Sequence, residues 1–279
     1  MSISAADVMA LRNKTNAPMM ECKAALIEAG GDMEKATEIL RKKSKDIQVK
    51  RGDRVTAEGR IAVFVDAAQK VGAIVELRCE SAPVAKTETF VKLANDIAKQ
   101  AAIGNPANVD ALLHQSVAPG KTVNDRIDEA HATIREIMKL QRFTRLTGLL
   151  GDYTHHDGTL GVLLQVEGAS ADPQLLRDVC MHIAARNPVA ATQADVPGSV
   201  IEKEKEIARD QLANDPKNKN KPPQIMEKIL EGKLKTWLAE NVLVEQPFVK
   251  DDSKTVGQLL AQSGLKLVKF IRYRVGELS

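Results

Sequence analysis

The stretch from Val71 to Ala102 constrains the fold of this 279-residue chain more than any other, because two periodicities follow each other within it. The first part has a period of two, with Ala73, Val75, Leu77 and Cys79 on one side and Ile74, Glu76 and Arg78 on the other. This period predicts a strand with one face in a core. The second part predicts an amphipathic helix, since apolar residues recur every three or four positions: Phe90, Leu93, Ala94, Ile97 and Ala101. The loop between them, Glu80–Lys86, has an apolar tip, which indicates a contact surface.

The same order of elements occurs again later in the chain. LGVLLQVEGAS followed by PQLLRDVCMHIAARNP repeats the pattern of GAIVELRCES followed by TFVKLANDIAKQAAIGNP, with an apolar strand, a loop, and a helix before Asn-Pro. Alternating residues in 60–66 predict a hairpin with the first strand, and Asp157-Gly158 predicts a hairpin turn between 143–153 and 159–167. The fold class is therefore predicted to be α+β, with two related subdomains built on small antiparallel sheets.

The N-terminal residues 1–43 predict a docking domain of three short helices. Their boundaries are marked by Ser4 with Asp7, by Pro18, by Gly30-Gly31 and by Asp32. The second helix carries two adjacent apolar rows: Met19, Cys22 and Leu26 in one, and Met20, Ala24 and Ile27 in the other. A core of three short helices cannot absorb both rows, so some of Leu11, Met19 and Met20 are expected at the surface. The alternative is that both methionines fill the core, and spacing alone does not separate the two.

The remaining domain boundaries follow from changes in composition. Residues 44–59 predict a basic linker, for which RNA contact is the sharper alternative. Residues 60–140 and 141–279 predict the two core subdomains. The second contains an antiparallel helical hairpin at 199–241, begun by a capping box of Ser199 with Glu202 and turned at a lysine-rich stretch, 214–223. Its charged first arm favours projection from the body, although packing against a neighbouring subdomain is equally compatible.

Composition disfavours several functions. The formal charge of +3 reflects 40 basic against 37 acidic residues, and only 3% of residues are aromatic, so nucleic acid is an unlikely main partner. The three cysteines have no paired spacing, the five histidines have no metal-ligand spacing, and no Gly-rich phosphate loop or serine elbow occurs. We expect no catalytic residues, no metal, no cofactor and no membrane span, and a cytoplasmic protein that binds a partner rather than an enzyme.

Several segments resemble bacterial translation elongation factor Ts in the same order along the chain. They are LRNKTNAPMMECKAALIEAGGDMEKATEILRKK, RVTAEGRIAV, IVELRCES, MHIAARNP, EKILEGKLK and QPFVKDDSKTVGQLL. The resemblance implies a ubiquitin-associated-like N-terminal domain, two related α+β subdomains and a helical hairpin used for dimerisation. It also implies a function, which is guanine-nucleotide exchange on elongation factor Tu by disturbing its Mg²⁺ and phosphate site so that GDP leaves.

The resemblance also implies which residues contact elongation factor Tu. These are Arg12, Met19 and Met20 in the N-terminal domain, the tip residues Ser81, Ala82, Pro83 and Val84, and His155, although His156 could be the aligned residue. The tip departs from the family, which usually has Thr-Asp-Phe-Val there. We expect exchange to persist with Pro83 and Val84 as a smaller rigid wedge. The alternative is an RNA-associated or structural binding module on the same scaffold that has lost its exchange loop.

Overall fold

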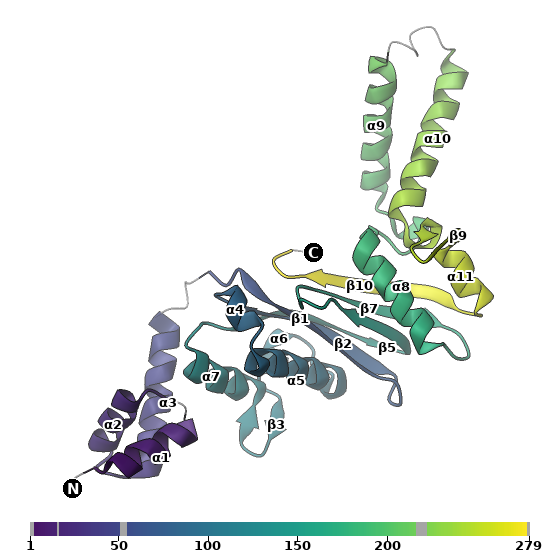
Figure 1. The fold of residues 1–279 in the computed structure, drawn as a ribbon. Coiled ribbons are helices and arrows are strands. Elements are labelled where there is room, and N and C mark those ends of the chain that lie inside the picture. The colour runs from purple at the N-terminus through teal and green to yellow at the C-terminus, as the bar shows by residue number, and fades with distance from the viewer. Residues whose placement is uncertain (1–2, 16, 51–54, 216–221, 278–279) are drawn as a thin grey trace.

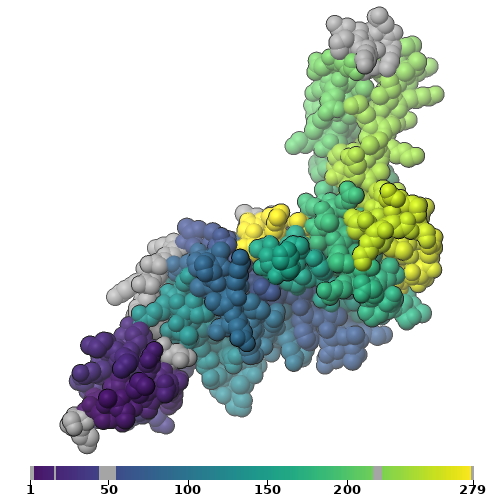
Figure 2. Space-filling view, in the orientation of Figure 1, coloured from purple at the N-terminus to yellow at the C-terminus, as the bar shows by residue number. Residues whose placement is uncertain are grey.

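A computed structural model describes residues 3–15, 17–50, 55–215 and 222–277. The molecule is elongated, with a three-helix domain at one end, two sheets with their helices in the middle, and a helical hairpin projecting at the other end (Figures 1 and 2). Small antiparallel sheets combined with segregated helices confirm the predicted α+β class. None of the helices in the described part of the chain has the length and apolar character that crossing a membrane requires.

Helices and strands follow in the order drawn in Figure 1. They are α1 (Ala5–Thr15), α2 (Met19–Glu28), α3 (Met33–Lys50), β1 (Glu58–Asp66), β2 (Val71–Cys79), α4 (Ala82–Ala85), α5 (Glu88–Gly104), α6 (Val109–Leu113), β3 (Ser116–Ala118), β4 (Lys121–Thr122), α7 (Val123–Ile134), β5 (Lys139–Thr147), β6 (Leu149–Thr154), β7 (Leu160–Glu167), α8 (Pro173–Arg186), α9 (Gly198–Asn214), α10 (Pro223–Asn241), β8 (Pro247–Phe248), β9 (Asp251–Thr255), α11 (Val256–Gln262) and β10 (Lys266–Arg274).

The N-terminal domain forms from the predicted start and stop signals. Ser4 and Asp7 exchange hydrogen bonds at the start of α1, and Asp32 accepts from two amides at the start of α3. The helix α3 runs to Lys50, so the expected end of helical structure near Lys43 is wrong. Its second half, KKSKDIQVK, contains four lysines, and lysine is a good helix former. Residues 51–54 of the predicted basic linker lie outside the described residues.

The first sheet has the order β1-β2-β5 and carries α5 on one face. Phe90, Leu93 and Ile97 of α5 are buried in the same core as Val75 and Leu77 of β2. The opposite face of β2 is also buried, which differs from the expectation of one covered face. The second sheet packs against it, and the interface between the sheets contains Ile61, Ile74, Leu146, Leu163 and Tyr273.

The expected boundary between the subdomains at residue 140 falls inside β5, which pairs with β2 in the first sheet. The predicted strand over 143–153 is therefore two strands in different sheets. Gly148 separates β5 from β6 with a φ of +112°, a conformation that favours glycine, and its amide donates to the carbonyl of Lys70 at 2.8 Å. A single glycine thus redirects the chain from one sheet to the next.

The second sheet has the order β10-β7-β6 and packs against α8. The predicted internal repeat is visible at the helix ends. Both α5 and α8 end on an asparagine in the left-handed conformation, Asn105 with φ 46° and Asn187 with φ 47°, and each is followed by proline. The sheets approach closely at Gly161, where an added Cβ would lie 2.6 Å from Ile61 Cγ2.

The helical hairpin of α9 and α10 projects away from the sheets (Figure 1). Its base is held by a small core that includes Ala190, Leu238 and Val242. The expected capping box of Ser199 with Glu202 does not form, because α9 begins one residue earlier, at Gly198, with Pro197 as its N-cap and no side-chain cap bond. Residues 216–221 of the predicted lysine-rich stretch, 214–223, lie outside the described residues.

A buried histidine joins α8 to the base of the hairpin. His182 Nδ1 accepts from the amide of Val249 at 3.2 Å, so the ring hydrogen is on Nε2, which donates to Gln246 Oε1 at 2.9 Å. The amide nitrogen of Gln246 donates to the carbonyl of Glu240 at 2.6 Å. Burial lowers the pKa of His182 below its ordinary value of 6.5, with the Gln246 bond opposing this shift. The apolar helical pattern around His182 predicts a core or edge histidine with its polar atoms satisfied, and the structure confirms this.

We expect the free energy of unfolding to fall as the pH drops below 6.5, because the unfolded chain then binds a proton at His182 that the folded chain resists. The slope from this one group is at most about 1.4 kcal/mol per pH unit. Urea denaturation between pH 8 and 5 measures it. His182→Gln should flatten the dependence and His114→Gln, at an exposed position, should not. An unchanged slope in His182→Gln would contradict this assignment.

Candidate partner-binding surface

An exposed apolar row lies along α2. Met20 is 75% exposed and Ile27 is 62% exposed, while Met19 beside them is 45% exposed. Arg12 on α1 is also exposed. Leu11 is fully buried, so the expectation that some of Leu11, Met19 and Met20 lie at the surface is met by the two methionines. Cys22 and Leu26 fill the small core instead, which leaves the second predicted row to solvent. Methionine side chains suit such a surface because they are apolar and adapt to the shape of a partner.

The predicted apolar tip is a single helical turn, α4. Ala82 and Pro83 are exposed, Val84 is half-buried against the first core, and Ala85 is buried. Pro83 fixes one backbone dihedral in this turn, and the Thr87 hydroxyl donates to the carbonyl of Val84 at 2.8 Å. The tip is therefore a preorganised protrusion of small apolar side chains rather than an open loop.

Hydrogen bonds to Glu136 hold the start of this turn. The Ser81 hydroxyl donates to Glu136 Oε1 at 2.5 Å, and the Ser81 amide donates to Glu136 Oε2 at 3.0 Å. In the opposite direction the amide of Ile137 donates to Glu80 Oε1 at 2.8 Å. Burial and the nearby Glu136 carboxylate raise the pKa of Cys79 to about 12, so this thiol stays neutral and donates to the carbonyl of Ser81.

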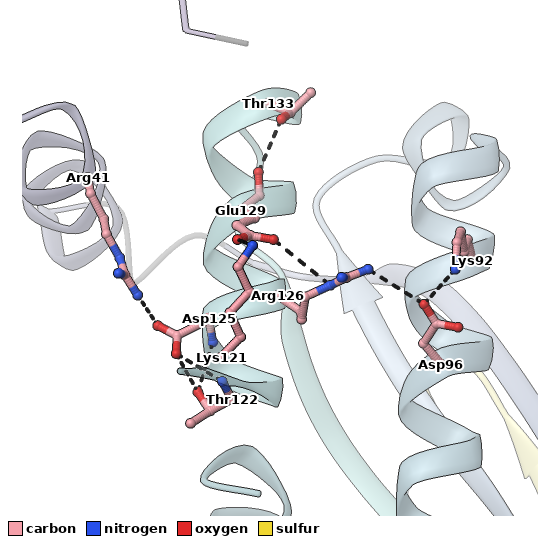
Figure 3. Close-up of polar contacts among 9 residues, drawn as sticks. All are labelled: Arg41, Lys92, Asp96, Lys121, Thr122, Asp125, Arg126, Glu129 and Thr133. Carbon is pink, nitrogen blue, oxygen red and sulfur yellow. Dashed lines mark hydrogen bonds and ion pairs between the residues drawn. The ribbon is translucent and has the colours of Figure 1, made fainter. Parts of the chain in front are cut away.

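Two ion pairs attach the N-terminal domain to α7. Arg135 Nη2 lies 2.6 Å from Glu21 Oε1 on α2, and Arg41 on α3 pairs with Asp125 (Figure 3). Asp125 also caps α7. Hydrogen bonds from Thr122, with the nearby Arg41 guanidinium, keep the pKa of Asp125 below its ordinary value despite partial burial. The exposed methionines are thereby placed relative to the core.

His155 lies in the turn between β6 and β7. Its Nδ1 is 2.9 Å from the Tyr153 hydroxyl, and its ring centroid is 4.3 Å from that of His156, which is the more exposed of the two. The two rings are neighbours because these residues form a turn and not the extended strand that would separate them. The carbonyl of Gly158 accepts from the amide of Ile61 at 2.8 Å, so this turn contacts β1.

The predicted site residues are thus connected through a short series of contacts. Glu21, next to Met20, pairs with Arg135, and the neighbouring Glu136 accepts hydrogen bonds from Ser81. Ser81 precedes α4, which contacts β1, and β1 in turn contacts the turn that contains His155. Sequence reasoning missed Arg135 and Glu136, because the spacing of Ile127, Ile134, Ile137 and Met138 predicts one amphipathic helix over 123–140 that includes both residues. The usual signal for a helix end is glycine, whereas here Arg135 itself takes the left-handed conformation, with φ 66°.

Comparison with known proteins matches most of the chain to one family. The family model described as Elongation factor TS matches residues 83–277. Elongation factor Ts of Thioalkalivibrio sulfidiphilus is 42% identical over 99% of this chain and 93% of its own length. The proteins of the same name from Methylococcus capsulatus and Clostridium perfringens are 43% and 39% identical, with the same shares of each chain covered.

Proposed function

The chain belongs to the elongation factor Ts family, and we propose that it promotes the release of GDP from elongation factor Tu without making or breaking a covalent bond. The observation that carries this proposal is the pairing of an exposed, adaptable apolar row on α2 with a rigid apolar turn at α4, joined through residues 135 and 136. The apolar row on α2 suits docking on a protein surface, and the turn α4 suits insertion between helices or strands of that protein.

The two parts have different tasks in this proposal. Met19, Met20 and Arg12 dock on the GTPase, and Ser81–Val84 press against its nucleotide-binding domain. The proline at the start of α4 and the bonds from Ser81 to Glu136 mean that little conformational entropy is lost on insertion. His155 is the third proposed contact, with its ring oriented by Tyr153, and the more exposed His156 is its alternative.

Exchange by this route requires thermodynamic linkage. A factor that favours the nucleotide-free conformation weakens GDP binding, and GDP weakens the factor by the same free energy, about 3 kcal/mol or more for an effective exchange factor. Titration of elongation factor Tu with the chain at increasing GDP concentrations tests this. We expect the apparent Kd of the chain to rise with GDP, and a Kd independent of GDP would contradict the proposal.

Docking should depend on the exposed methionines of α2. Met19→Ser with Met20→Ser is expected to weaken binding to nucleotide-free elongation factor Tu by about ten- to a hundredfold, through loss of buried apolar area. Calorimetry measures the affinity. Met9→Ser is a matched control, because Met9 is as exposed as Met19, at 45%, but lies on α1. Equal weakening by Met9→Ser would mean that the α2 row is not the docking surface.

The hairpin is the part that we propose for self-association. An open groove of about 560 Å³ lies between α9 and α10, lined by Ile207, Leu234 and Trp237 among others.

The rival function, an RNA-associated module, would be recognised by RNA affinity that falls steeply with salt, because each neutralised phosphate releases counterions.

A further inference from the structure

We propose that residues 135–137 form a joint that fixes the position of α4 relative to α2, which makes Arg135 and Glu136 positioning residues for nucleotide release. The proposal rests on the proposed function for its activity readout, and on contacts within this chain for its geometry. Arg135 holds the N-terminal domain and Glu136 holds the wedge, although the two are adjacent in sequence. The side chains of one dipeptide therefore reach both proposed contact surfaces.

The backbone of the joint is fixed from within the core. The amide of Arg135 donates to the carbonyl of His131 at 2.7 Å and closes α7 in the left-handed conformation. The ring of His131, which is buried, donates from Nδ1 to the carbonyl of Glu136 at 2.6 Å, because a carbonyl oxygen can only accept. These two bonds set the directions in which the Arg135 and Glu136 side chains leave the chain.

On the wedge side, the contact is a reciprocal clamp. Residues 80–81 and 136–137 exchange the hydrogen bonds Ser81 Oγ to Glu136, Ser81 N to Glu136 and Ile137 N to Glu80. Two of them end on a single carboxylate, and hydrogen bonds to a charged acceptor are stronger than neutral ones. Ser81, which directly precedes α4, is thus tied to the joint, so the wedge cannot shift without breaking charge-assisted bonds.

On the docking side, the contact is an ion pair beside the exposed methionines. Glu21 immediately follows Met20, and its carboxylate and the Arg135 guanidinium are about half exposed, at 43% and 48%. Such a pair contributes little to global stability. Together with the Arg41–Asp125 pair (Figure 3), it fixes the domain at two points along α7 and restrains rotation about either one. The Glu21–Arg135 pair therefore affects the orientation of the N-terminal domain more than the free energy of unfolding.

Arg135→Gly separates these roles, because glycine favours the left-handed backbone and keeps the helix end while the ion pair is lost. We expect an unchanged or higher Tm and a two- to fivefold slower chain-stimulated GDP release, roughly the range of an exposed ion pair. Glu136→Ala should slow release by about tenfold, and Glu136→Gln, which keeps one acceptor, by less. Arg126→Gln is the control. It removes the exposed pairings of Arg126 on α7 with Asp96 on α5 and with Glu129 on α7, which touch neither contact surface (Figure 3).

The double variant Arg135→Gly with Glu136→Ala distinguishes a joint from two local effects. If relative position is what matters, both substitutions loosen the same restraint, and the double variant should be no slower than Glu136→Ala alone. If the double variant slows release by the product of the two single effects, the proposal is overturned. A Tm in Arg135→Gly that falls in step with the release rate would overturn it too, since the role would then be structural.

A second readout does not depend on nucleotide release. Spin labels on cysteines introduced at exposed Lys23 and Lys86 report the distance between α2 and α4, the native cysteines being buried. The distance distribution should broaden in Arg135→Gly and in Glu136→Ala and stay unchanged in Arg126→Gln. An unchanged distribution in both joint variants overturns the joint even if release slows. Failure of the unmodified chain to stimulate release, with the distribution broadening as expected, would overturn the proposed function alone.

Discussion

Glu76→Ala is expected to lower the free energy of unfolding by about 3 to 5 kcal/mol, because it leaves two arginines without their buried counter-charge. Glu76 is fully buried between the sheets and accepts from Arg78 Nε at 2.8 Å and from Arg142 Nε at 2.6 Å. The amide of Gly276 also donates to it, at 3.1 Å, so this carboxylate ties the end of β10 to the first sheet. Urea denaturation monitored by circular dichroism measures the change.

Two further variants serve as comparisons for Glu76→Ala. Glu76→Gln keeps the size and one acceptor oxygen, so its loss should be smaller than that of Glu76→Ala. Glu167→Ala removes an exposed carboxylate from the end of β7 and should change stability by no more than about 0.5 kcal/mol. A cost below about 1 kcal/mol for Glu76→Ala would mean that the arginines are stabilised by other partners.

Pro83→Gly with Val84→Ser is expected to slow chain-stimulated GDP release by about 30- to 100-fold, equivalent to losing a binding hot spot of 2 to 3 kcal/mol. The reason is that this pair removes both the rigid backbone of α4 and the side chain that would enter the partner. Stopped-flow fluorescence of a labelled GDP measures the rate. Lys86→Ser, at the exposed C-cap of the same turn, should leave it unchanged.

Restoring the residues usual in the family tests the size of the wedge. Ala82→Asp with Pro83→Phe should raise the release rate above that of the natural sequence, because an aromatic ring buries more apolar area than proline. Equal rates would mean that the tip tolerates either side chain. Unimpaired release by Pro83→Gly with Val84→Ser would show that α4 is not the wedge.

Much of the fold could be predicted because local signals agree with the tertiary structure. The alternation in 71–79, the helical spacing in 88–104 and the capping signals at Ser4 and Asp32 all recur in the structure. The excess of apolar rows on α2 predicted that some of Leu11, Met19 and Met20 lie at the surface, and in the structure the two methionines do.

What the sequence did not predict depends on contacts between distant segments. Ile74 and Glu76 belong to a buried face only because a second sheet covers them, and alternation within one strand cannot indicate that cover. The change of sheet at Gly148 is hidden because the residues on both sides favour strands. The clamp at Glu136 joins residues 55 positions apart, and the end of α7 at Arg135 lacks the usual glycine.

The most direct test of the proposed function is the rate of GDP release from elongation factor Tu. Elongation factor Tu loaded with a fluorescent GDP is mixed in a stopped-flow instrument with increasing concentrations of the chain and an excess of unlabelled GDP, which prevents rebinding. We predict that the release rate rises with the concentration of the chain and saturates. A rate that stays at the spontaneous value at every concentration would contradict exchange activity.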